Sequence, residues 1–279
     1  MSTEIMAQLV ARIEALPPMP QSVFKLREAL AKPDVNYSDI VAPLKDDPGI
    51  CADLLRVANS ARYGVSHKVD TVEEAVRYFG MPSLVDFVAA ACSERIIKSS
   101  FANISNLNEF MQHSKLIAKS TACFCALIRM NTRAAESYSI SGLLHDIGKL
   151  VALLVTDERK FSKESIGVYW DEISPEVASE MQILGLNHAE MGKLICQKWQ
   201  FPERIVNAVE RHHTPLRGGD FSFDGMIVYI SELLATEELP DSLLAKSIPP
   251  GLMKELKIGP DDLLDARKAF FRDLAKPVH

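Results

Sequence analysis

The sequence lacks the features that define several large classes of protein. Its longest apolar runs, such as Leu150–Val155, fall far short of the roughly 18 residues that a membrane span needs. With 13 Gly and 15 Pro, it has too few of either for a low-complexity or collagen-like chain. The first residues include Glu4 but no basic segment followed by an apolar core, so no export signal is predicted. We therefore expect a globular cytoplasmic protein that does not cross a membrane.

Basic residues are outnumbered by acidic ones, and cysteines are few. The formal net charge is −6 at pH 7, and no window clusters Lys and Arg as binding to a phosphate backbone requires. We therefore expect no contact with nucleic acid. The cysteines are odd in number and lie in apolar, helix-like segments, which predicts unpaired thiols in a reducing compartment. They are Cys51, Cys92, Cys123, Cys125 and Cys196.

Helical spacing of apolar residues runs through nearly the whole chain, and no strictly alternating segment bounded by turn residues interrupts it. The sequence therefore predicts an all-α fold of many helices. Capping residues and prolines indicate where helices begin, and glycines indicate where they end. The expected starts are Asp47–Pro48, Thr71 with Glu74, Asn187 with Glu190, and Pro202, and the expected ends are Gly80 and Gly185.

The least helical stretches suggest loops and a domain boundary. They cover residues 16–20, 98–107, 157–174 and 214–225. Only His67 precedes the second stretch, whereas the other histidines follow it. We therefore expect an N-terminal helical lobe over residues 1–100 and a second helical domain over residues 101–279. The tail from Pro249 predicts two amphipathic helices that pack back on the second domain.

Chemistry is concentrated around the segment GLLHDIGKL, residues 142–150. An adjacent imidazole and carboxylate at the end of an apolar helix are costly to bury unless they are hydrogen-bonded, paired or bound to metal. Both are ligands that Fe, Mn, Zn or Mg accept, and Fe or Mn is favoured because no thiolate is among the candidates. The candidate ligands are His145 and Asp146, the i, i+4 pair Glu109 and His113, His188 at a helix start, and His212 and His213 at a helix end.

Each candidate also has a simpler interpretation. A lone His145 is more often a hydrogen-bonded core histidine, and Asp146 also serves as a helix cap or an ion-pair partner. Glu109 by itself is typical of a solvated surface charge. The histidines at helix ends also cap a helix or complement its dipole. Lys149 either steers a phosphate or is simply solvated.

Several segments, taken in chain order, resemble the HD superfamily of metal-dependent phosphohydrolases. They are HSKLIAKSTA, GLLHDIGKL, LGLNHAEMGKLICQKWQFP and IVNAVERHHTP. The upstream half is similar to the HDOD branch, with its Leu-Pro-x-x-Pro, Asp-Pro and Asn-Ser signatures. These lie in LPPMPQSVFKLREAL, DDPGICADLLRVANSARYG and TVEEAVRYFGMPSLVDFV. The resemblance covers about residues 16–234.

This resemblance implies an all-helical HD-type core preceded by a helical lobe, in a bacterial signalling protein. Many relatives have lost their metal ligands, whereas this chain keeps an unusually full set. The resemblance implies metal ligands, or their neighbours, at Glu109, His113, His145, Asp146, His188, His212 and His213, with Asp146 and Lys149 as candidate catalytic residues.

The sequence departs from the family pattern in two places. After His213 it reads TPLRGGDFSFDG, without the Asp-Gly-x-Gly-Tyr-Pro segment of the HD-GYP relatives that degrade cyclic di-GMP. The final helix aspartate of HD enzymes is expected within MIVYISELLA, where Ser231 takes its place. Glu232 is expected to point elsewhere, since neighbours on a helix do not share a face. Both departures argue against cleavage of cyclic di-GMP.

Two functional hypotheses follow. The first is a signalling module whose site binds a divalent metal or a phosphorylated or nucleotide ligand, and whose helical lobe contacts a protein partner. The second is an active metal-dependent phosphohydrolase that acts on a nucleotide or cyclic dinucleotide. For Asn59–Ser60 and Asp46–Asp47–Pro48, a purely structural role in starting or ending a helix is the simpler interpretation.

Overall fold

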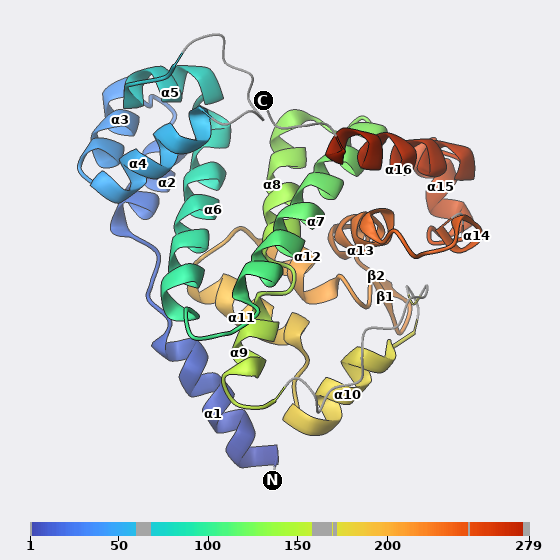
Figure 1. Ribbon diagram of the computed structural model, residues 1–279. Helices are drawn as coiled ribbons and strands as arrows, with labels where there is room; N and C mark the ends of the chain where they lie inside the picture. Colours follow the sequence, from blue (N-terminus) through green and yellow to red (C-terminus); the bar gives the residue numbers. More distant parts are fainter. Residues whose placement is uncertain (1, 60–67, 158–168, 170–171, 245, 276–279) are drawn as a thin grey trace. The chain divides into compact units, whose positions relative to one another are not determined.

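The computed structural model describes residues 2–59, 68–157, 169, 172–244 and 246–275. Helices dominate these residues (Figure 1), which confirms the predicted all-α class. The described strands, β1 (Leu216–Arg217) and β2 (Asp220–Phe221), form a short antiparallel hairpin. None of the helices in the described part has the length and apolar character that crossing a membrane requires.

The chain divides into two compact units. One of them comprises residues 17–100. Its core contains fully buried Leu26, Ile40, Leu44 and Leu84. Its helices are α2 (Gln21–Ala31), α3 (Tyr37–Lys45), α4 (Pro48–Ala58), α5 (Val72–Phe79) and α6 (Met81–Ser100).

The motif residues of this unit have structural roles. The carboxylate of Asp47 accepts hydrogen bonds from the backbone N–H groups of Gly49 at 3.0 Å and Ile50 at 3.1 Å, and so opens α4. The side chain of Asn59 pairs with both backbone groups of Val69, at 2.8 Å each. These contacts agree with the interpretation that both motifs have a structural role at the start or end of a helix. Ser60 lies outside the described residues.

The other unit comprises residues 2–16 and 101–275 of the described chain. Helix α1 (Ser2–Ala15), which was expected in the N-terminal lobe, lies in this unit. It belongs to the histidine-bearing unit because it packs on α9, α10 and α11 and buries Leu9 and Ile13. The other helices are α7 (Leu107–Leu127), α8 (Thr132–Leu144), α9 (Ile147–Leu153), α10 (Pro175–Leu184), α11 (His188–Lys198), α12 (Glu203–Arg211), α13 (Phe223–Ala235), α14 (Asp241–Leu244), α15 (Pro250–Leu256) and α16 (Pro260–Leu274).

Helix α13 is the central element of this unit. Its residues from Gly225 to Ala235 are all buried, and it packs against α7, α8, α12 and α16. Helix α16 contributes buried Leu263 and Phe270 to the same core. This arrangement confirms that the C-terminal tail packs back on the domain.

The cysteines agree with the expectation of unpaired thiols. All five are free. Burial raises the pKa of Cys92, Cys125 and Cys196 to about 12, so these thiols stay protonated at neutral pH and are poor metal ligands.

Candidate metal centre

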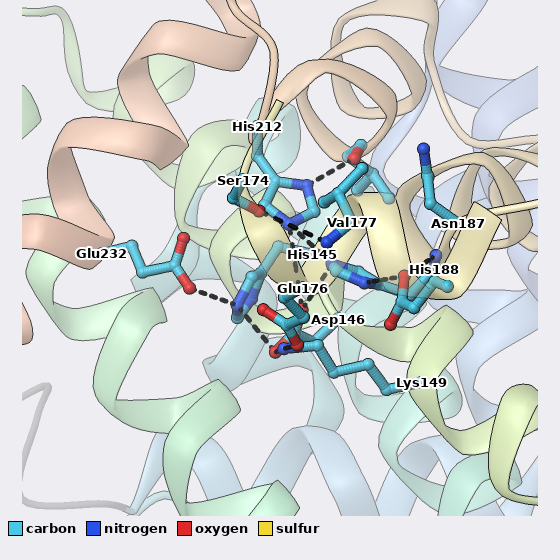
Figure 2. A network of polar contacts seen from close by, with 12 residues as sticks. His145, Asp146, Lys149, Ser174, Glu176, Val177, Asn187, His188, His212 and Glu232 are labelled. Carbon is cyan, nitrogen blue, oxygen red and sulfur yellow. Dashed lines mark hydrogen bonds and ion pairs between the residues drawn. The ribbon is translucent and has the colours of Figure 1, made fainter. Parts of the chain in front are cut away.

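The candidate ligands come together because several helix ends meet inside the unit of residues 101–275. His145 directly follows α8, Asp146 precedes α9, His188 is the first residue of α11, and His212 directly follows α12. Figure 2 shows these four side chains converging on one point. Asp146 is 3% exposed and the three histidines are fully buried.

Asp146 is the centre of the cluster, and its two carboxylate oxygens face different imidazoles. Its Oδ1 lies 3.2 Å from His188 Nε2 and 3.8 Å from His212 Nε2. Its Oδ2 lies 3.3 Å from His145 Nε2 and 3.6 Å from His113 Nε2. The carboxylate therefore stands between two pairs of histidines.

The imidazole spacing suits cation binding. Within each pair the Nε2 atoms are 3.3 Å apart, for His113 with His145 and for His188 with His212. Nitrogen ligands about 2.1 Å from one metal ion lie roughly 3.0–3.4 Å apart at octahedral or tetrahedral angles. Each pair therefore has the spacing of two ligands on one ion.

The other ring nitrogens set the orientation of the imidazoles. His145 Nδ1 donates to the Gly142 carbonyl at 2.8 Å, and His212 Nδ1 donates to the Val209 carbonyl at 2.6 Å. A carbonyl oxygen only accepts, so Nδ1 carries a proton in both rings and Nε2 is the nitrogen that faces Asp146. Metal-binding histidines are typically held in this way.

The electrostatics of the cluster favour positive charge. Although burial opposes it, Asp146 and Glu232 raise the pKa of His145 to about 10. Burial and neighbouring histidines lower the pKa of His212 and His113, so these rings remain neutral. The carboxylates therefore attract positive charge, here the proton on His145. A metal ion would have to displace that proton, whereas the neutral rings of His113 and His212 are already able to ligate it.

Buried polar atoms that make no hydrogen bond also bear on whether a metal fits. Within the described part of the chain, Asp146 Oδ1, Glu232 Oε1 and His213 Nε2 are buried and make no hydrogen bond. Buried polar atoms are rarely left unpaired. Oxygen and imidazole nitrogen are the donors that Fe and Mn accept, so this donor set fits a divalent metal.

Helix α13 corrects one expectation. Ser231 Oγ donates to the Ile227 carbonyl at 2.6 Å, and the Ser231 carbonyl accepts from Ser120 Oγ at 2.6 Å. Glu232 instead places Oε1 3.7 Å from His145 Nε2 (Figure 2). The prediction that Ser231 takes the place of the family's final carboxylate and that Glu232 points elsewhere was wrong. One residue turns a helix by about 100°, and it is Glu232 that this turn brings to the centre.

Glu109 is the one expected ligand that the structure does not bring to the cluster. It is exposed in the first turn of α7. It is absent from the groups of described residues whose possible ligand atoms lie within 4.8 Å of one another, whereas His113 and His213 are present in them. Residues i and i+4 share a helix face but lie about 6 Å apart along the axis, and the cluster lies level with His113.

Two carboxylates of α10 that lie at the cluster were not predicted from the sequence. Glu180 Oε2 accepts hydrogen bonds from His188 Nδ1 at 2.7 Å and from the His188 backbone N–H at 2.8 Å. Glu176 lies 2.9 Å from Lys149 Nζ, which is also 3.0 Å from Asp146. Lys149 thus bridges two carboxylates, and its catalytic role stays a prediction. The sequence did contain a signal for them, since Glu176 and Glu180 are four residues apart and therefore share a helix face.

We expect Glu180→Gln to lower metal affinity about 10- to 100-fold, as loss of a hydrogen-bond partner behind a ligand does. The reason is that the carboxylate fixes the ring orientation of His188. Calorimetric titration with Mn²⁺ measures the effect. Glu203→Gln, at the exposed start of α12, is the control. Equal affinity in the two variants would contradict the orienting role of Glu180.

A close helix crossing also holds the cluster. A Cβ atom on Gly148 would lie 2.0 Å from the carbonyl oxygen of His188, so α9 and α11 touch there. We expect Gly148→Ala to lower the free energy of unfolding by about 1–3 kcal/mol, as overpacking does, and to weaken metal binding because His188 moves. Chemical denaturation measures the first effect. Gly251→Ala, where a Cβ atom meets nothing within 4 Å, should be tolerated.

The fold and the site together define a class: an all-helical protein with a buried histidine–aspartate centre between helix ends. The HDOD domain family matches residues 16–215, and the chain belongs to this family. An uncharacterized protein of Treponema pallidum is 30% identical over 216 residues, which are 76% of this chain and 40% of that protein. The chain thus spans less than half the length of this relative.

Solved structures have the same fold. A putative phosphohydrolase from Shewanella amazonensis is 20% identical with a TM-score of 0.63, over 96% of this chain and 94% of that one. A putative metal-dependent phosphohydrolase from the same organism is 16% identical with a TM-score of 0.62, over 96% and 97%. A putative signal transduction protein from Marinobacter aquaeolei is 17% identical with a TM-score of 0.68, over 97% and 63%.

Proposed function

We propose that the chain is a cytoplasmic signalling module whose buried centre binds divalent metal, with Fe or Mn favoured, and through it a phosphorylated or nucleotide ligand. The observation that carries this proposal is the placement of Asp146, whose oxygens each face a pair of imidazole Nε2 atoms. A carboxylate in this position would offer one donor oxygen to each of two metal subsites.

Each subsite has its own donors. Asp146 Oδ2 with His113 and His145 would hold one ion, and Asp146 Oδ1 with His188, His212 and His213 would hold the other. Bound divalent ions supply Lewis acidity and an anchor for phosphate oxygens. The chain's own residues would hold the ions, orient the bound phosphate and balance the charge around both.

The signalling role rests on the family and on one relative's description. The HDOD match covers residues 16–215, and the Marinobacter structure belongs to a protein described as acting in signal transduction. We propose that residues 17–100 contact a protein partner. The net charge of −6 supports a partner other than nucleic acid.

Hydrolysis is a second candidate, and Glu232 favours it. The absence of the last carboxylate was one reason to expect no cleavage of cyclic di-GMP, and Glu232 supplies a carboxylate 3.7 Å from His145. In this candidate Asp146 and Lys149 would act on a nucleotide or cyclic dinucleotide at the centre. The Shewanella structures belong to proteins described as phosphohydrolases, which agrees with this candidate.

Metal analysis of the full chain, purified without chelator after expression with Fe and Mn supplied, tests the proposal. We expect at least one bound divalent ion per chain, and binding of inorganic phosphate only by the metal-loaded protein. A metal content near zero would contradict the proposal. Metal-dependent hydrolysis of an aryl phosphate diester that disappears in His145→Ala would establish the second candidate.

Cyclic di-GMP is expected to remain intact with the metal-loaded protein. The segment after His213, TPLRGGDFSFDG, lacks the Gly-Tyr-Pro feature of the relatives that cleave it. Chromatography of cyclic di-GMP after incubation with the protein checks this expectation. Appearance of the linear dinucleotide, lost again in His145→Ala, would reverse it.

A further inference from the structure

A cavity of about 300 Å³ adjoins the metal centre. His113, His213 and Glu232 line the part that belongs to the centre, and Thr236 and Leu239 line another part. Since α13 ends at Ala235, these last two residues belong to the segment that follows the helix carrying Glu232. The end of α13 therefore forms both a possible ligand and a wall of the cavity.

Arg267 of α16 fastens this segment. Its guanidinium donates to the carbonyls of Leu239 at 2.6 Å, Thr236 at 2.7 Å and Glu237 at 2.6 Å. It also lies 3.2 Å from the carboxylate of Asp241, and the residue is 7% exposed. Thr236 caps α13, and Glu237 and Leu239 follow the helix. Backbone carbonyls outside a helix need partners from elsewhere when they are buried. The planar guanidinium satisfies several of them at once.

The wall of the cavity combines polar and apolar side chains. Glu232 is acidic, and the segment after α13 adds the polar side chains of Thr236 and Glu238. Apolar surface comes from Leu116 and Ile117 of α7, Tyr229 and Leu233 of α13, and Leu239. Apolar walls beside a few polar groups are typical of sites that bury the organic part of a ligand.

We propose that residues 236–239, held by Arg267, form the wall that selects the organic group of a phosphate ester, and that this group is apolar. The inference rests on the proposed function, because the phosphate would be bound at the metal centre. Arg267 is then a positioning residue, which acts through the carbonyls it holds. The HDOD match ends at residue 215, so this wall lies outside the matched region.

Two ligands with the same anionic head test the wall. Methylphosphonate and phenylphosphonate differ only in the organic group and resist hydrolysis. By calorimetry with the metal-loaded full chain, we expect phenylphosphonate to bind about tenfold more tightly, the order expected when part of an apolar ring leaves water. In Arg267→Ala this ratio should fall toward one, while metal content and methylphosphonate affinity stay the same. Arg267→Lys should give an intermediate ratio, because an ammonium group lacks the planar fork.

Leu239→Ala provides a second variant that leaves the Arg267 side chain in place. It should lower the ratio as well, and Lys268→Ala at an exposed position of α16 should not. A ratio near one in the unaltered protein, or an unchanged ratio in Leu239→Ala, would overturn the inference and leave the metal proposal standing. An equal loss of both affinities in Arg267→Ala would assign the residue a purely structural role and also overturn it. If neither phosphonate binds the unaltered protein, the proposed function fails and this inference with it.

Discussion

Replacement of Asp146 by Ala should remove metal binding almost completely, with a loss of affinity of at least about 100-fold. Loss of a partner behind a ligand already costs about 10- to 100-fold. Asp146 contributes more, because its two oxygens lie 3.2 Å from His188 and 3.3 Å from His145, so both proposed subsites lose a donor. Metal content by elemental analysis and Mn²⁺ affinity by calorimetry measure the effect.

Asp146→Asn separates charge from shape in this experiment. It keeps the size of the side chain but removes its negative charge, and we expect nearly the same loss of metal. Asp265→Asn is the matched control, since its side chain is 79% exposed on α16. Retention of a full complement of metal in both Asp146 variants would show that the carboxylate is a structural partner of Lys149 and the histidines only.

The second large effect is expected in α13, where substitution of one residue should lower metal affinity and substitution of its neighbour should not. Glu232→Gln should lower metal affinity by at least about tenfold, because Glu232 Oε1 lies 3.7 Å from His145 Nε2 and is otherwise without a hydrogen bond in the described structure. Ser231→Ala should leave metal affinity unchanged. The lost hydrogen bond to the Ile227 carbonyl should cost about 1 kcal/mol of unfolding free energy.

Ser231→Asp extends the same comparison. If Ser231 stood at the position of the missing carboxylate, this change would raise metal affinity. Because Ser231 is fully buried and its hydroxyl donates to the Ile227 carbonyl of its own helix rather than to the cluster, we instead expect an uncompensated buried charge that costs about 3–5 kcal/mol. Melting temperature and metal titration on the same samples distinguish the two results. A rise in affinity without a lower melting temperature would restore the original alignment.

The sequence predicted the features that depend on local chemistry. Thr71 accepts from the Glu74 backbone N–H at 3.2 Å, and Asn187 and Glu190 form a capping box, both as expected. Gly80 and Gly185 end their helices with positive φ angles of 74° and 81°. Such signals are readable because a capping side chain and the backbone group it satisfies lie within a few residues of each other.

The hairpin of β1 and β2 was not predicted from such local signals. Residues 214–225 were expected to be a loop, yet Leu216 pairs with Phe221 around Gly218 and Gly219, whose φ angles of 59° and 85° form the tight turn. Arg211 holds the hairpin through Asp220 at 2.8 Å. Strands of two residues are too short to show alternation, so only the structure identifies them.

By itself the sequence determined the all-α class, the helix starts and most of the histidine–aspartate set, because apolar periodicity, caps and the order of motifs are written along the chain. Tertiary structure decided which carboxylates contact the histidines of the cluster. It brought Glu180 to His188 and Glu232 to His145, left Glu109 exposed, and joined α1 to the histidine-bearing unit. The physical reason is that a contact between distant helices depends on crossing points and on the rotation of each helix, and one residue of rotation is enough to exchange Ser231 for Glu232.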